Sequence, residues 1–457
     1  MKTPGLDQIA GALRRLTPVR PVARVTELRP NRITMTRADL DLALGDQVEF
    51  LGHTPRLTGE VVGIKGNSIS VVVEGPVDVL GLGDRVAPLG PFAIAPHDGW
   101  IGRVVDPWGQ PMDDRPIFEG PNARPVNTGP PAAAARRGFG GRLKTGLLAL
   151  NTMLPLVRGQ RIGLFAGAGV GKSTLIGTLA NDIEADVVVV GLVGERGREV
   201  GAFVRQILGE DGMARSVVVA ATSDQPALTR RRAALSAATV AEHFRDQGKN
   251  VLLLIDSITR LAEAQREIAA AAGESPSFRG FPPSVQPLLA GLAERAGPGE
   301  AGQGDITAVF SVLVAGSDMG EPIADTLRGV LDGHIILSRS IAERGRFPAI
   351  DLSRSVSRSL PDAATAEENR LIAETRRLLT LYEKSEVMIR SGLYQPGTNA
   401  ELDRAVAIFP ALDAFIGQRA HLDFNESFAE LAAALTVPTE TTEPDFEEGT
   451  AQPTPAP

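Results

Sequence analysis

The sequence predicts an α/β protein with a parallel sheet at its core, a small β-barrel before it and a helical domain after it. Between residues 151 and 360, short apolar runs such as RIGLFAG and NVLLLIDS alternate with helical segments, as in a sheet covered on both faces. Residues 22–92 hold six short stretches of alternating apolar and polar positions, which predict a barrel. Residues 361–437 follow a helical pattern throughout. The α/β core is expected to span residues 93–360, beginning with a connector rich in proline and glycine.

Composition excludes several classes of function. The 457 residues contain no cysteine, which excludes a disulfide scaffold, a cysteine nucleophile and a thiolate metal site. The 47 basic and 55 acidic residues give a net charge of −8, which disfavours nucleic-acid binding. The chain shows neither an apolar run of about 20 residues nor a secretory signal, so we expect a cytoplasmic protein.

The two ends of the chain differ from the rest. Apolar residues at helical spacing between Leu6 and Leu16 predict an amphipathic helix in residues 1–20. Two interpretations stay open: the helix packs on its own protein, or it binds a partner. The last segment, residues 438–457, has five prolines, five acids and no basic residue, so we expect a disordered tail. The barrel is then expected to span residues 21–92.

A phosphate-binding loop is the strongest local motif. The letters AGAGVGKS at 166–173 follow a predicted strand and begin a predicted helix, with Ala166 in place of the usual first glycine. Glycines allow backbone N–H groups to surround a phosphate, and the helix N-terminus adds a positive dipole. Lys172 is expected to contact the β- and γ-phosphates, and Ser173 to ligate Mg²⁺. The expected nucleotide-binding residues of this loop are Ala168, Gly169, Val170, Gly171, Lys172, Ser173 and Thr174.

Two acids end predicted strands where such a sheet presents its ligands. Asp256 follows the run VLLLI and is expected to hold Mg²⁺, directly or through water. The alternative is that Asp256 only caps the next helix. Glu195 ends the run VVVVGLVG and is our candidate for the carboxylate that orients or deprotonates the attacking water.

Six motifs occur together in one order across residues 160–360. They read AGAGVGKSTL, VGERGREV, VLLLIDSITRLAEAQRE, GFPPSV, LVAGSDMGEPIADTLRGVLDGHIILSR and FPAIDLSRSVSR. Together they resemble the catalytic ATPase of type III export systems, a family similar to the catalytic subunit of the rotary ATP synthase. The resemblance extends more weakly over residues 20–435. It implies a RecA-like P-loop NTPase core that uses ATP and Mg²⁺.

The resemblance also assigns residues that local patterns do not. It implies a catalytic role for Arg196, beside Glu195, and an arginine finger at Arg358 that enters the neighbouring subunit's site. It implies an adenine pocket lined by Phe347, with Tyr394 as a possible second wall. A finger supplied by a neighbour implies a closed ring, and the family implies a homohexamer. The segment 318–322 is then expected near the central pore, where the family contacts a coiled-coil stalk protein.

The favoured hypothesis is an ATPase that energises protein export and releases export substrates from chaperones. The expected partners are a stator-like regulatory protein at the N-terminus, the stalk protein, chaperone–substrate complexes and a membrane export gate. The membrane is reached only through these partners, at the inner-membrane export apparatus. Motif wording such as RSVVVAATSDQPAL resembles flagellar members more than virulence members. A rotary ATPase subunit, a hexameric RNA translocase and a non-enzymatic subunit are the alternatives.

Overall fold

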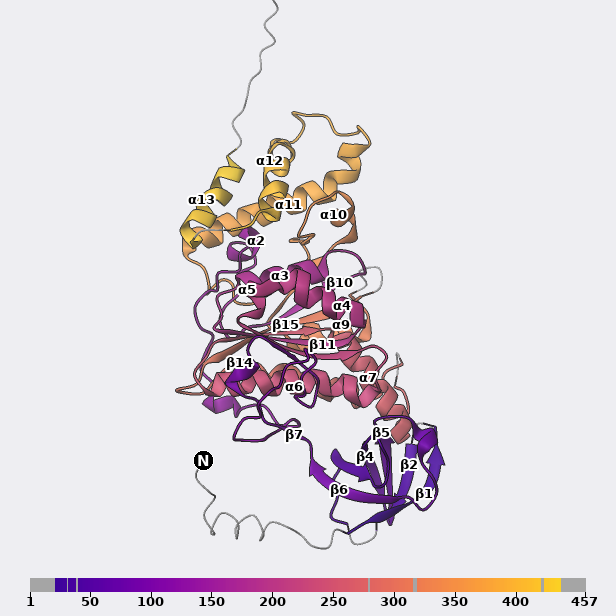
Figure 1. Cartoon of the computed structure of the whole chain (residues 1–457). Coiled ribbons are helices and arrows are strands. Elements are labelled where there is room, and N and C mark those ends of the chain that lie inside the picture. The colour runs from indigo at the N-terminus through magenta and orange to yellow at the C-terminus, as the bar shows by residue number, and fades with distance from the viewer. Residues whose placement is uncertain are drawn as a thin grey trace, which may run out of the picture.

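The computed structural model of the chain describes residues 21–30, 32–37, 40–277, 280–314, 319–420 and 423–436. Three tiers follow one another in Figure 1: a barrel, a sheet flanked by helices, and a helical C-terminal part. The predicted fold class is thereby confirmed. The helix expected in residues 1–20 and the tail expected in residues 438–457 lie outside the described residues.

Six antiparallel strands close the N-terminal barrel in the order β1-β2-β5-β4-β3-β6. Alternation places every second residue of a strand inside, as with Ile33 and Met35 on the second strand and Ile69 and Val71 on the fifth. The strands are β1 (Ala23–Arg29), β2 (Arg32–Thr36), β3 (Asp46–Phe50), β4 (Leu57–Lys65), β5 (Ser68–Val73) and β6 (Arg85–Pro91).

The central sheet has nine strands, eight of them in the order β17-β16-β10-β15-β13-β11-β12-β8, while β14 pairs with β15. All pairs are parallel except those made by β14 and β17. The strands are β8 (Arg103–Val105), β10 (Arg161–Ala166), β11 (Val187–Glu195), β12 (Ser216–Thr222), β13 (Val251–Asp256), β14 (Gly297–Pro298), β15 (Asp305–Leu313), β16 (Gly333–Leu337) and β17 (Val356–Ser357).

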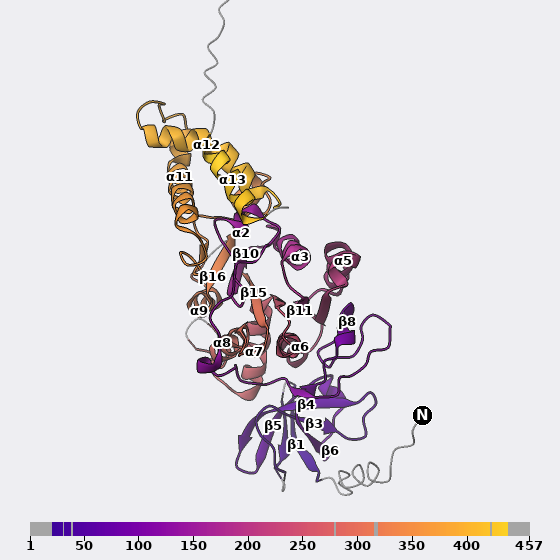
Figure 2. The same ribbon diagram turned by 90° about the vertical axis from the view of Figure 1, so that its left-hand side faces the viewer.

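Helices cover both faces of this sheet (Figure 2). In β11, Val188 and Val190 face one apolar core, and Val187 and Val189 face the other, which explains why the strand reads as apolar throughout. One face carries α3 (Lys172–Asp182), α4 (Gly197–Ala202), a π-helical turn η4 (Phe203–Leu208) and α5 (Gly209–Met213). The other carries α6 (Ala227–Asp246), α7 (Ile258–Ala272), α8 (Val285–Arg295) and α9 (Pro322–Val330).

The segment expected to be a connector supplies part of the sheet. The short strand β8 pairs in parallel with β12 at the sheet edge and is buried. Only three residues long and flanked by turns, it is too short to produce a strand pattern in the sequence. The same region forms a two-stranded ribbon from β7 (Ala93–Ile94) and β9 (Arg124–Pro125), and the short helix α2 (Leu148–Asn151).

Three helices form the C-terminal tier: α11 (Ala366–Arg390), α12 (Ala400–Gly417) and α13 (Phe424–Leu435). A capping box of Thr365 and Glu368 fixes the start of α11. The short helix α10 (Arg339–Glu343) lies between the sheet and this tier. In the part of the chain that the structure describes, no helix combines the length and the apolar character needed to cross a bilayer.

A buried cluster of charges joins the barrel to the nucleotide-binding tier. Arg231 and Arg232 of α6 both pair with Glu60 of β4, and Arg232 also pairs with Glu74. The Arg232 guanidinium lies 4.6 Å from the centre of the Phe92 ring. Because the Arg232 and Glu74 side chains are only 2% exposed, neither charge has water as an alternative partner.

We predict that Arg232→Ala lowers the unfolding temperature by several degrees. Losing one partner of a buried ion pair costs about 3–5 kcal/mol, because the Glu74 carboxylate stays buried without its cation, whereas Glu60 keeps its pair with Arg231. Differential scanning calorimetry measures the shift. Arg339→Ala is the matched control, since the Arg339–Glu343 pair is exposed. Equal unfolding temperatures for the two variants would contradict the prediction.

Candidate nucleotide site

The phosphate loop joins the carboxyl end of β10 to the start of α3. Gly169 and Gly171 have positive φ values of 76° and 88°, a conformation that side-chain-bearing residues rarely adopt. Val170 is buried and anchors the loop, while Ala168 is exposed. No side chain caps α3, so the backbone N–H groups of Lys172, Ser173 and Thr174 point out of the helix end. This is the arrangement that binds phosphate at a helix N-terminus.

Lys172, at the start of α3, contacts Asp256, at the carboxyl end of β13. The Lys172 ammonium forms an ion pair with the Asp256 carboxylate, and these side chains are only 12% and 4% exposed. The Ser311 hydroxyl of β15 donates to the same carboxylate at 2.6 Å. Asp256 is therefore held by groups from two other elements, α3 and β15, and not merely placed before the next helix.

Glu195 and Ser173, the residue after Lys172, line one cavity. A cavity of about 150 Å³ is lined by Ser173, Glu195, Glu199 and Asp256 together with apolar side chains. Burial raises the pKa of the Glu195 carboxyl to about 7, and the Asp256 charge adds to the rise, while Lys172 opposes it. A carboxyl with a pKa near neutrality is suited to accept a proton at physiological pH.

Sequence reasoning did not single out Glu199. Glu199 stands four residues after Glu195, in the first turn of α4, and lines the same cavity. Its hydrogen bond with Glu195 is the largest of the causes that lower the Glu199 pKa, followed among the lowering effects by Arg196. The spacing of four residues between Glu195 and Glu199 was the available signal, but it brings the two side chains together only if a helix begins directly after β11.

Arg196 lies elsewhere than the sequence suggested. Its side chain is 70% exposed and pairs with Glu199 at 2.9 Å. It is not among the residues that line the Glu195 cavity. A catalytic role for Arg196 therefore stays a prediction without support from its position.

A second, larger cavity of about 530 Å³ borders the phosphate loop. Gly167 and Ala168 line it together with Arg260 of α7 and Arg339 of α10. Arg260 pairs with Glu263 at 2.9 Å. Sequence reasoning did not single out Arg260, although it follows Asp256 by four residues and lies in the first turn of the helix that comes after β13.

The residues fit a magnesium ion bound together with a nucleotide. The Ser173 hydroxyl and the Asp256 carboxylate line one cavity, and oxygen donors are the ligands that Mg²⁺ prefers. Within the described ranges, no group of three or more His, Asp or Glu side chains is arranged to hold a metal. Few protein ligands are typical of Mg²⁺ that shares its coordination with phosphates.

Phe347 lies at the phosphate loop, whereas Tyr394 does not. Phe347 is 51% exposed, and a Cβ added to Gly171 would lie 3.2 Å from its ring. The backbone oxygen of Phe347 also borders Gly417, at the C-terminal end of α12. Tyr394 bonds to Asp403 near the other end of α12, about 20 Å away along the helix. The structure therefore does not bring the two rings together.

Arg358 lies at the opposite end of the sheet from its own phosphate loop. Ser357 pairs with Gly333 on β16, which is level with Ile162 on β10. Ala166 lies four residues further along β10 and two strands away, so the two positions are about 16 Å apart. Arg358 continues away from the loop, and its guanidinium donates to the Arg328 carbonyl at 3.0 Å. It therefore cannot reach the nucleotide site of its own subunit.

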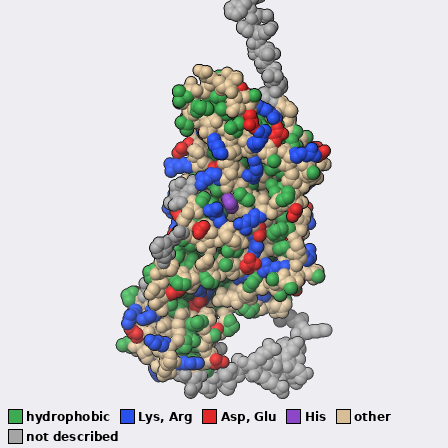
Figure 3. Space-filling model, turned by 180° about the vertical axis from the view of Figure 1, so that it is seen from behind, with side chains coloured by type: hydrophobic (Ala, Val, Ile, Leu, Met, Phe, Trp, Pro, Cys, Tyr) green, Lys and Arg blue, Asp and Glu red, His purple; other side chains and the backbone are tan. Residues whose placement is uncertain are grey.

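Arg358 lies beside Arg328 and His334. Figure 3 shows Lys and Arg side chains near a histidine on this face of the molecule, with acidic side chains between them. Burial is the main reason that the His334 pKa is lowered, and the charges of Arg328 and Arg358 lower it further. Among the described residues, no carboxylate forms an ion pair with Arg358. An anion on another molecule would therefore find this guanidinium available.

Comparison with known proteins gives two matches to protein families. Residues 146–357 match the nucleotide-binding domain of the ATP synthase alpha/beta family. Residues 364–433 match the C-terminal domain of the type III secretion ATPase EscN.

Curated relatives cover nearly the whole chain. The flagellum-specific ATP synthase of Caulobacter vibrioides is 44% identical over 423 residues, covering 90% of this chain and 95% of the relative. That of Salmonella typhimurium is 40% identical over 432 residues, covering 90% and 93%.

Solved structures agree with this relationship. The assembled ATPase EscN from the type III secretion system of enteropathogenic E. coli superposes with a TM-score of 0.85 at 36% identity, covering 91% of this chain and 100% of that chain. EscN in complex with its central stalk EscO gives a TM-score of 0.82 at the same identity and coverage. The chain therefore belongs to the family of flagellum-specific ATP synthases and type III secretion ATPases, within the ATP synthase alpha/beta family.

Proposed function

We propose that this protein hydrolyses ATP in a homohexameric ring and thereby energises protein export through a flagellar type III apparatus. One observation carries the proposal. Lys172, Glu195 and Asp256 lie together at the carboxyl ends of the parallel strands, whereas Arg358 lies at the opposite end of the same sheet. A site that needs both sets of residues is complete only where two subunits meet.

The residues divide the chemistry of hydrolysis between them. On nucleotide binding, the Lys172 ammonium exchanges Asp256 for oxygens of the β- and γ-phosphates, and the amides at the start of α3 hold the same phosphates. Glu195 accepts a proton from the attacking water or orients it. Ser173 and Asp256 would hold Mg²⁺, which would supply positive charge to the phosphate oxygens.

The neighbouring subunit supplies the last group. Arg358 offers a planar guanidinium that is always charged and that fits the oxygens of the transferring phosphoryl group. Phe347 offers an exposed aromatic ring beside Gly171, which is suited to stacking against adenine. Tyr394 has no support for that role from its position.

The flagellar assignment rests on the relatives. Flagellum-specific ATP synthases are 40–46% identical to this chain, and the virulence ATPase EscN is 36% identical. The structure of EscN with EscO supports a stalk protein as a partner of this chain too. The expected stalk contact at 318–322 is described only from Met319 onward. Release of substrates from chaperones, contact with an export gate, and location at the inner membrane are parts of the same proposal.

We predict that kcat/KM for ATP falls as the pH drops below about 7. The raised pKa means that Glu195 becomes protonated through that range, and a protonated carboxyl cannot accept a proton from water. Glu195→Gln should bind ATP, lose about 10²–10⁴-fold in kcat, and show no such pH dependence. Steady-state hydrolysis from pH 5.5 to 8.5 measures both, with ATP binding by Glu195→Gln as the control. A Glu195→Gln enzyme with normal turnover would remove Glu195 from this role.

We predict that Arg358→Ala and Lys172→Ala are each inactive but complement one another in mixed rings. An Arg358→Ala subunit keeps its phosphate loop, and a Lys172→Ala neighbour provides the missing guanidinium. Random mixing in equal amounts places about a quarter of the interfaces in the productive order. The hydrolysis rate of mixtures across a range of ratios tests this. Rates that never exceed those of the separate variants would argue that Arg358 does not act between subunits.

We predict that deletion of the gene abolishes flagellar filaments and swimming, and that the wild type but not Lys172→Ala restores both. Lys172→Ala loses the contact to the γ-phosphate, so hydrolysis stops while the protein remains present. Filament counts by electron microscopy and swimming in soft agar are the measurements. Normal filaments in the deletion strain would contradict the flagellar assignment and leave the nucleotide site untouched.

A further inference from the structure

Arg358 projects from a backbone segment that is held from both sides. The neighbouring residues Ser357 and Ser359 are buried, and their hydroxyl groups lie 2.8 Å apart. Both hydroxyls donate to the carbonyl of Pro155, at 2.7 and 3.1 Å. The backbone N–H of Arg358 donates to the Asp332 carbonyl at 3.0 Å. The start of the arginine side chain is therefore fixed although its end is exposed.

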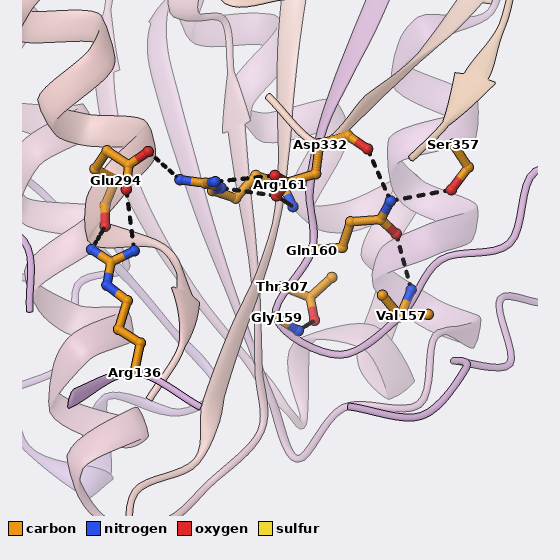
Figure 4. A network of polar contacts seen from close by, with 9 residues as sticks. All are labelled: Arg136, Val157, Gly159, Gln160, Arg161, Glu294, Thr307, Asp332 and Ser357. Atoms are coloured by element: carbon orange, nitrogen blue, oxygen red, sulfur yellow. Dashed lines mark hydrogen bonds and ion pairs between the residues drawn. The ribbon is translucent and has the colours of Figure 1, made fainter. Parts of the chain in front are cut away.

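Gln160 forms hydrogen bonds with two residues that contact or adjoin Arg358, namely Asp332 and Ser357 (Figure 4). Its Nε2 donates to the Asp332 carbonyl and to the Ser357 hydroxyl, each at 3.1 Å. Its Oε1 accepts the N–H of Val157 at 3.0 Å, which sets the orientation of the amide. The Gln160 residue is fully buried, so no water competes for these hydrogen bonds.

Arg161, the residue after Gln160, binds the side chain of Asp332. Its backbone N–H and its guanidinium make three hydrogen bonds of 2.9–3.0 Å to the Asp332 carboxylate. The same guanidinium reaches Glu294 of α8, which also pairs with Arg136 (Figure 4). Asp332 is thus fixed by hydrogen bonds to its carboxylate and to its carbonyl. Because the same carbonyl accepts the backbone N–H of Arg358, it also fixes the backbone of Arg358.

We propose that Gln160 is a positioning residue for Arg358, and that it acts on the nucleotide site of the neighbouring subunit. The inference rests on the proposed role of Arg358 between subunits. Gln160 precedes β10, whose other end begins the phosphate loop about 20 Å away. A change at Gln160 therefore disturbs the guanidinium given to the neighbour and leaves the phosphate loop of its own subunit in place.

Gln160→Leu tests the proposal, because it keeps the volume and removes all three hydrogen bonds. We expect kcat to fall about 10- to 100-fold with little change in KM for ATP, as for a group displaced by about 1 Å. Mixed rings then separate the two sites. Lys172→Ala subunits bring an intact Arg358 and should raise the rate of Gln160→Leu. Arg358→Ala subunits bring none and should not.

Each other outcome is decisive. A rate recovered with Arg358→Ala would place the defect in the variant's own nucleotide site and overturn the proposal, as would an unchanged kcat. If Gln160→Leu does not fold, Ser357→Ala loses the same Gln160 contact, and its recovery pattern decides in its place. Gln303→Leu is the matched control, since the Gln303 side chain accepts the backbone N–H of Glu300 in a turn remote from Arg358, and the variant should retain normal rates. Failure of the reference mixture of Lys172→Ala with Arg358→Ala would contradict the proposed function, and this inference with it.

Discussion

The ion pair between Lys172 and Asp256 is the interaction on which the rest of the site depends. A carboxylate that is 4% exposed at the end of a parallel strand is stable only with a cation beside it. Parallel strands bring their carboxyl ends to one edge, so the helix that follows β10 delivers Lys172 next to the end of β13. The same negative charge at Asp256 is one cause of the raised pKa of Glu195. Topology, charge balance and the candidate base are therefore parts of one arrangement.

The length of strand β10 separates the phosphate loop of a subunit from the residues that support its Arg358. Its carboxyl end leads into the phosphate loop that serves its own subunit, and the residues at its start hold the backbone from which Arg358 projects. A six-residue strand is too long for one arginine side chain to bridge. The geometry thus favours head-to-tail contacts, in which the edge with β16 and β17 faces the nucleotide site of the next subunit. Contacts of this kind form a ring where the rotation between subunits closes, as in the proposed assembly.

Sequence patterns were sufficient to single out candidate residues where the signal was local. The phosphate loop, Asp256 and Glu195 each follow an apolar run, and the order strand, loop, helix is visible in the letters alone. Sequence patterns failed where the signal depends on distant contacts. Strand β8 has three residues and exists because β12 offers it an open edge. Glu199 faces the cavity only because α4 begins at once after β11. The separation of Tyr394 from Phe347 depends on the length of α12, which no local pattern around either ring records.

Charge balance gives a physical reason for the proposed role of a second subunit. Glu195, Glu199 and Asp256 line one small cavity with Ser173, while Lys172 pairs with Asp256. The raised pKa of Glu195 relieves part of the excess negative charge, because the carboxyl shares a proton near neutral pH. A nucleotide brings further negative charge into this space, so added cations must accompany it. In the proposed ring, Mg²⁺ would supply some, and the Arg358 guanidinium of a neighbour, which has no carboxylate partner among the described residues of its own chain, would supply more. In the proposed ring, hydrolysis is then tied to assembly, because a separate subunit lacks the Arg358 guanidinium of a neighbour.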